Sequence, residues 1–203
     1  MPLKAVIFDL GGVLVRTLNP QPRQLLAARL GISPDELSRI VFDSDTARLA
    51  TLGTITTGEH WRAIQASLGL SAEEFSTVPL EFWGGDHLDL GLVEFLRALR
   101  PRYKTALLSN AWDDLRQAVE ERWQIADAFD ELVISAEVGL AKPDERIFTL
   151  ALSRLDVLPV EAVFVDDFVE NVAAARRLGM QTVLFQSPEQ VLNELKTRMA
   201  AWN

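Results

Sequence analysis

Residues 4–13 read KAVIFDLGGV, a short apolar run that ends in an aspartate and two glycines. Apolar residues that follow one another without a polar interruption are typical of a strand buried on both faces of a sheet. Asp9 then falls at the carboxyl end of that strand, where open parallel sheets bind their ligands. An aspartate before glycines is also common in an ordinary turn, so the rest of the chain decides what this segment means.

Four further runs share the texture of the first. Segments rich in Val, Ile, Leu and Phe occur at 105–109, 132–135, 162–166 and 182–185, and longer stretches with helical spacing separate most of them. This alternation predicts an α/β protein with a Rossmann-like parallel sheet covered by helices on both faces, in three layers. Helix starts are marked by Ser33-Pro34 and Ser71, and helix ends by Gly31 and Gly69.

The first two predicted strands are unusually far apart. Residues 16–85 show several helical segments and no convincing strand, although a parallel crossover needs only one helix. We interpret this stretch as a small α-helical cap inserted after the first strand, with the return near Trp83-Gly84-Gly85. We expect residues 1–15 and 86–203 to form the Rossmann-like core.

Composition excludes several classes of site and partner. The 203 residues are 48% hydrophobic and 24% charged, as in soluble globular proteins, and the absence of cysteine rules out disulfides, thiolate zinc sites and cysteine nucleophiles. Two histidines are too few for a multi-histidine metal site. A net charge of −9 opposes nucleic-acid binding, and no apolar run is long enough for a membrane span or a signal peptide. We expect a cytoplasmic monomer or homodimer.

Polar side chains that can carry chemistry occur at the ends of the predicted strands. A carboxylate, a hydroxyl, a lysine and a carboxylate pair would share one rim of the sheet. Each alone has an ordinary explanation as a turn, a helix cap or a solvated loop, but their order along one α/β pattern favours a common site. They are Asp9, Ser109-Asn110, Lys142-Pro143 and Asp166-Asp167, with Asn171 following.

This ordered set resembles the four motifs of the haloacid dehalogenase superfamily. The resemblance covers essentially the whole chain, since the helical stretch is similar to the cap that the superfamily inserts after the first strand. Glycine at position 11 further resembles a capped, phosphatase-like subgroup with glycine in place of the second aspartate of motif one.

The resemblance implies a role for each residue. Asp9 would attack phosphorus and form an aspartyl-phosphate, assisted by Ser109 and Lys142. Mg²⁺ would bind the Asp9 carboxylate, the Gly11 carbonyl and the Asp166-Asp167 pair, with Asp167 the direct ligand and Asp166 assisting, an all-oxygen set of the kind Mg²⁺ prefers. The residues implied in phosphate binding are Gly11, Gly12, Ser109, Asn110 and Lys142.

Gly11 departs from the pattern of most phosphatases in the superfamily. An aspartate there protonates the leaving group, a transfer worth ~10²–10⁴-fold in rate. Three interpretations stay open: a phosphatase of a small phosphorylated metabolite, a 2-haloacid dehalogenase, or a non-catalytic phosphate-binding protein. The aspartate pair favours the first, because dehalogenases of this superfamily need no metal.

The predicted cap gives weaker indications of specificity. Residues 52–56 resemble the stretch between cap helices that faces the active site. Four side chains could line the cleft, although an ordinary role in the core or on the surface is the stronger expectation for each: Arg16, Arg48, His60 and Trp112. Trp61 is expected in the cap core.

Overall fold

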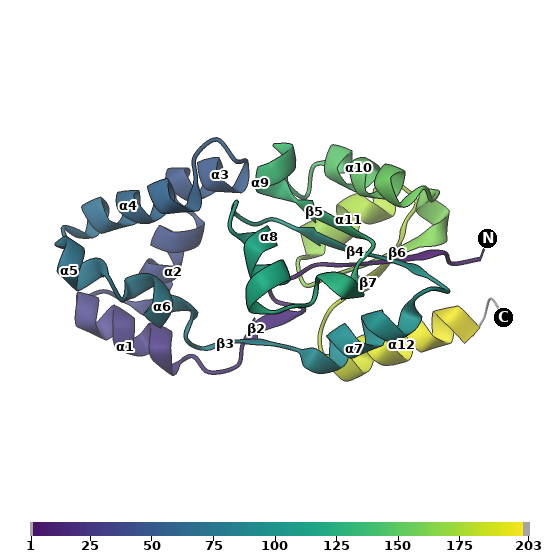
Figure 1. Cartoon of the computed structure of the whole chain (residues 1–203), viewed down its shortest axis with the longest axis horizontal. Helices are drawn as coiled ribbons and strands as arrows, with labels where there is room; N and C mark the ends of the chain where they lie inside the picture. The colour runs from purple at the N-terminus through teal and green to yellow at the C-terminus, as the bar shows by residue number, and fades with distance from the viewer. Residues whose placement is uncertain (1, 201–203) are drawn as a thin grey trace.

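A five-stranded parallel sheet forms the centre of the larger lobe in the computed structural model, which describes residues 2–200 (Figure 1). Its strand order is β5-β4-β1-β6-β7, so β1 lies in the middle and every neighbouring pair is parallel. All five predicted strands are confirmed, with ends that move by at most two residues. Their bounds are β1 Ala5–Phe8, β4 Lys104–Ser109, β5 Glu131–Ile134, β6 Ala162–Asp166 and β7 Gln181–Leu184.

Helices cover both faces of this sheet, which confirms the three-layer α/β prediction. Side chains of β1 alternate between the layers: Val6 and Phe8 join one core cluster, whereas Ala5 and Ile7 join the other. The first layer contains α7 (Leu90–Leu99), α8 (Leu115–Gln117) and α12 (Pro188–Ala200). The second contains α10 (Glu145–Leu155) and α11 (Val169–Arg177).

The first six of the seven helices between β1 and β4 form a second lobe, which we name the helical insertion (Figure 1). They pack around their own cluster of fully buried side chains, including Leu26, Leu37 and Phe82. The serine caps expected at Ser33 and Ser71 are present, and Gly31 and Gly69 adopt the left-handed conformation that ends α1 and α4. The helices are α1 Gln21–Leu30, α2 Pro34–Phe42, α3 Asp45–Thr51, α4 Thr57–Leu68, α5 Ala72–Phe75 and α6 Val78–Trp83.

The expectation that residues 16–85 contain no strand is wrong at their start. β2 (Val15–Thr17) pairs antiparallel with β3 (Asp86–Leu88), and the ribbon lies where the chain passes between the two lobes (Figure 1). Three-residue strands are too short for a period to be read, and the partner lies far along the chain. Thr17 donates to the Asp86 carboxylate at 2.6 Å, and Arg16 pairs with Asp89.

Short elements complete the larger lobe. They are α9 (Ser135–Val138), the π-helical turn η1 (Ala118–Arg122) and the 3₁₀ turns η2 (Ala126–Ala128) and η3 (Pro159–Glu161). Across residues 2–200, every helix is too short or too polar to cross a bilayer.

Candidate active site

The turn after β1 fixes the position of Asp9. The Leu10 N–H donates to Asp9 Oδ1 at 2.7 Å, and the Gly12 N–H donates to the Val15 carbonyl at 2.9 Å. Gly12 has a φ of +79°, and a β-carbon there would collide with the Asp167 side chain. Position 12 therefore needs glycine for its conformation and for the approach of Asp167. Its N–H donates within the turn and is therefore not free for the phosphate binding that the resemblance implies for Gly12.

Lys142 connects two carboxylates at the centre of the site. Its Nζ lies 2.8 Å from Asp9 Oδ1 and 2.7 Å from Asp166 Oδ2, and the lysine is only 5% exposed. The Asn110 side chain fixes the lysine backbone, because Nδ2 donates to the Lys142 carbonyl and Oδ1 accepts from the Lys142 N–H, both at 2.8 Å. The amide of Asn110 thus positions Lys142, although the sequence suggested that it binds phosphate.

Asp166 is fully buried at the end of β6, and both of its oxygens have partners. Asn171 Nδ2 lies 3.1 Å from each oxygen, the Phe168 N–H donates to Oδ1 at 2.7 Å, and Lys142 contacts Oδ2. A carboxylate that is so completely hydrogen-bonded orients the groups around it. Asp166 therefore fits a positioning role toward Lys142 better than direct metal coordination.

Asp167 presents the opposite case. Its Oδ1 is buried, and no group within residues 2–200 forms a hydrogen bond with it. One carboxylate oxygen from each of Asp9, Asp166 and Asp167 lies within 4.8 Å of the other two. Burial and the neighbouring Asp166 charge raise the pKa of Asp167, as expected for a carboxylate without a cation beside it. An unsatisfied buried oxygen is costly, and a cation bound here would remove that cost.

The charges of the site are consistent with a divalent cation. Three carboxylates, those of Asp9, Asp166 and Asp167, face the single ammonium of Lys142, so the ionised cluster carries two excess negative charges. Burial raises the pKa of Asp9 to about 7, although Lys142 opposes the shift. Hard oxygen donors with this excess charge suit Mg²⁺.

Ser109 and Gly11 occupy the expected places at the same rim. Ser109 ends β4, the strand next to β1, and is 3% exposed. Gly11 is exposed, and a β-carbon on it would meet no heavy atom of the described chain within 4 Å. Its φ also lies outside the left-handed range, unlike that of Gly12. The backbone at position 11 can therefore accept a side chain without strain.

Three of the four candidate cleft residues in the helical insertion and around it make other contacts. His60 is buried, with Nδ1 2.9 Å from Thr46 Oγ1 and Nε2 3.0 Å from the Val41 carbonyl. Arg48 is exposed, and Arg16 pairs with Asp89. Trp61 lies in the core of the insertion, as expected, and Trp112 lies in the same cluster.

Comparison with known proteins identifies the family. The model of a hydrolase family, the haloacid dehalogenase-like hydrolases, matches residues 3–179. The chain belongs to the haloacid dehalogenase-like hydrolases.

Two curated relatives of this hydrolase cover most of its length. It is 30% identical to bifunctional epoxide hydrolase 2 of Sus scrofa over 97% of the chain, but spans only 39% of that protein. It is also 30% identical to the sesquiterpene phosphatase astK of Aspergillus oryzae, covering 87% of each sequence.

A solved structure agrees in fold. The HAD family enzyme bt-2542 of Bacteroides thetaiotaomicron, crystallised with magnesium and inorganic phosphate, superimposes with a TM-score of 0.76. The match covers 92% of this hydrolase and 96% of that chain, at 24% sequence identity. At this identity the comparison shows that the two architectures are alike.

Proposed function

We propose that this hydrolase is a Mg²⁺-dependent phosphoric monoester hydrolase that acts on a small phosphorylated metabolite through an aspartyl-phosphate on Asp9. The observation that carries the proposal is the buried lysine shared by Asp9 and Asp166, next to the unsatisfied oxygen of Asp167. The name of the sesquiterpene phosphatase relative is consistent with this chemistry. We also propose that it belongs to the capped subgroup with glycine at position 11, the helical insertion acting as the cap.

Asp9 supplies the nucleophilic oxygen in this proposal. One carboxylate oxygen forms a bond to phosphorus while the phosphorus–oxygen bond of the ester breaks, and the leaving oxygen keeps the electron pair. Water then attacks the aspartyl-phosphate, which releases inorganic phosphate and regenerates the carboxylate. Burial suits Asp9 to this role, because a poorly solvated carboxylate is a stronger nucleophile than one in water.

Lys142 and Ser109 would stabilise the charge on the transferring group. The Lys142 ammonium already contacts the nucleophile and can offset the negative charge of carboxylate and phosphate together. Ser109 would donate its hydroxyl hydrogen to a phosphoryl oxygen. Asp166 and Asn110 hold Lys142 in place from opposite ends, through its ammonium and its backbone.

The carboxylates of Asp9 and Asp167 and the carbonyl of Gly11 would hold Mg²⁺. When bound, the ion would offset charge on the phosphoryl group. The unsatisfied Asp167 oxygen supports this assignment. It also separates the proposal from the 2-haloacid dehalogenase alternative, in which the superfamily uses no metal and the buried carboxylate would lack a cation.

The metal assignment predicts different effects for the two adjacent aspartates. Asp167→Asn should weaken Mg²⁺ binding about tenfold or more, because it removes a direct ligand, whereas Asp166→Asn should weaken it less and lower turnover by releasing Lys142. Calorimetric Mg²⁺ titrations, and release of phosphate from a panel of monoesters with and without a chelator, measure both effects. Chelator-resistant activity accompanied by halide release from a 2-haloacid would contradict the proposal and favour a dehalogenase.

A further inference from the structure

Residues 109–113 connect the phosphate site to the helical insertion without a break. Ser109 ends β4, and the Asn110 side chain holds the Lys142 backbone. The next residue is fixed as well: the Ala111 N–H donates to Ser135 Oγ at 2.9 Å, and the Ser135 hydroxyl donates to the Ala111 carbonyl at 3.0 Å. The first part of this segment is thus hydrogen-bonded to two places in the chain that follows β5 in the larger lobe.

Trp112 leaves the larger lobe and enters the core of the other. Its ring lies edge-on to three aromatic rings of the helical insertion, with centroids 4.7 Å from His60, 6.0 Å from Trp61 and 6.1 Å from Trp83. Only 9% of Trp112 is exposed. Edge-to-face packing at these distances is favourable beyond the area that it buries. Trp112 is therefore a core residue of the helical insertion that is carried by the phosphate-site loop.

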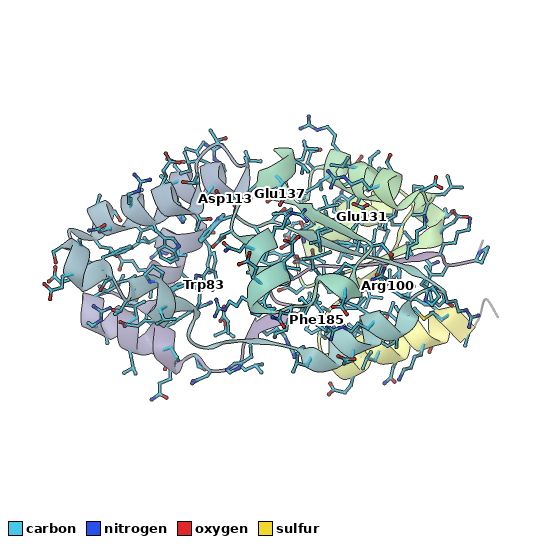
Figure 2. All side chains as sticks on the ribbon, in the orientation of Figure 1. Trp83, Arg100, Asp113, Glu131, Glu137 and Phe185 are labelled. Atoms are coloured by element: carbon cyan, nitrogen blue, oxygen red, sulfur yellow. The ribbon has the colours of Figure 1, made fainter. Side chains whose placement is uncertain are left out.

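Asp113 adds a polar contact beside the tryptophan. Its Oδ1 accepts hydrogen bonds from the Thr57 N–H at 2.8 Å and the Thr57 hydroxyl at 2.6 Å, at the first residue of α4. A carboxylate at a helix N-terminus is favourably placed, although Asp113 is exposed and solvent weakens the contact. Figure 2 shows Asp113 at the junction of the two lobes, and Trp83 on the edge of the insertion that faces the larger lobe.

A second contact closes the same side of the junction. Gly53, between α3 and α4, has a φ of +68°, and a β-carbon there would collide with the Ala136 carbonyl of α9. The backbones of the two lobes therefore touch beside Trp112 and Asp113. On the other side the lobes are joined covalently through the β2–β3 ribbon.

We propose that Trp112 and Asp113 are positioning residues that hold the helical insertion over the phosphate site, so that the insertion and the Ser109-Asn110 loop move together. This inference rests on the proposed function, because it assumes that the insertion contacts the leaving group of a phosphate ester substrate. A ligand that orders Ser109 and Asn110 also orders Trp112, two residues further along, and through it the insertion. The coupling is reciprocal, as linkage requires.

Kinetics on two substrates test the positioning role. In Trp112→Ala, kcat/KM for an aryl phosphate such as phenyl phosphate should fall about 10- to 100-fold, because its leaving group needs the insertion in place. With acetyl phosphate, whose leaving group is small, kcat/KM should change by less than about threefold. Asp113→Ala should show the same selectivity with a smaller loss, and Trp112→Phe should recover most of the aryl activity. Trp123→Ala is the matched control, since Trp123 is a partly buried tryptophan that packs against the core of the larger lobe, away from the insertion.

Hydrogen exchange tests the coupling without turnover. Exchange of residues 52–57 should slow when Mg²⁺ and beryllium fluoride occupy the phosphate site, and Trp112→Ala should abolish the slowing but keep the bound probe. Equal kinetic losses on both substrates, or slowing that persists in both Trp112→Ala and Asp113→Ala, would overturn the inference.

If the wild-type protein hydrolyses no phosphate ester and binds no beryllium fluoride, the proposed function fails. In that case faster exchange of residues 52–57 in metal-free Trp112→Ala, but not in Trp123→Ala, would still support the docking role of Trp112, and its absence would overturn it.

Discussion

Replacing Asp9 with asparagine is expected to abolish phosphate ester hydrolysis, with a loss on the order of 10⁴-fold or more in kcat. The asparagine amide has nearly the same shape as the carboxylate, so the turn after β1 and the core should remain. What disappears is the oxygen nucleophile beside Lys142. Initial rates on the best monoester, measured with saturating Mg²⁺, give the result directly. Wild-type rates in purified Asp9→Asn on any substrate would refute the mechanism.

The same variant carries its own control for folding. Burial raises the pKa of Asp9 to about 7, so the folded protein binds this proton more tightly than the unfolded chain does. The contribution of Asp9 to the free energy of unfolding of the metal-free protein therefore falls as pH rises from about 4 toward 7. Asp9→Asn should accordingly raise Tm near pH 8 without metal, and should raise it less near pH 5. A lower Tm in both conditions would show that lost activity reflects damage to the fold.

Gly11→Asp is expected to raise the ratio of alkyl to aryl phosphate hydrolysis by up to about 10²-fold. The leaving group of an alkyl phosphate is a strongly basic alkoxide, which needs a proton. The leaving group of an aryl phosphate is a stabler anion. Position 11 can take the new side chain, because its β-carbon would meet no heavy atom of the described chain within 4 Å and its φ needs no glycine. Parallel kcat/KM measurements on a sugar phosphate and an aryl phosphate give the ratio.

Two neighbouring variants make this test specific. Gly11→Asn has nearly the same size but cannot donate an acidic proton, so its ratio should stay near that of the wild type. Gly12→Asp should instead damage the site, because its side chain would collide with Asp167 at a positive φ. Unchanged Mg²⁺ affinity in Gly11→Asp combined with an unchanged ratio would mean that another residue supplies the proton, or that the site does not perform this chemistry.

Local patterns in the sequence predicted the features that depend on local causes. The five sheet strands follow from continuous apolar runs, and the rim with Asp9, Ser109 and Asp166-Asp167 follows from the place of each run's end. The serines that cap helix N-termini and the left-handed glycines that end helices follow from the preferences of single residues. Each of these is set within a few residues of the chain.

What the sequence missed depends on partners far along the chain. The β2–β3 ribbon pairs segments that are each three residues long, with too little periodicity to read. The resemblance implied phosphate binding by Asn110, and nothing local indicates that its side-chain amide binds the backbone of Lys142, 32 residues away. Trp112 was recognised as a core residue or a cleft residue, but aromatic character does not say which of two cores it enters.

Beryllium fluoride, which mimics a phosphoryl group on an aspartate, tests whether Asp9 accepts that group beside Mg²⁺. Titrations with and without Mg²⁺, followed by crystallography of the complex, locate the probe. We expect inhibition only in the presence of Mg²⁺, with the probe bonded to an Asp9 oxygen and contacted by Lys142 and Ser109. Density on any other residue, or no binding to a protein that has been shown to bind Mg²⁺, would contradict it.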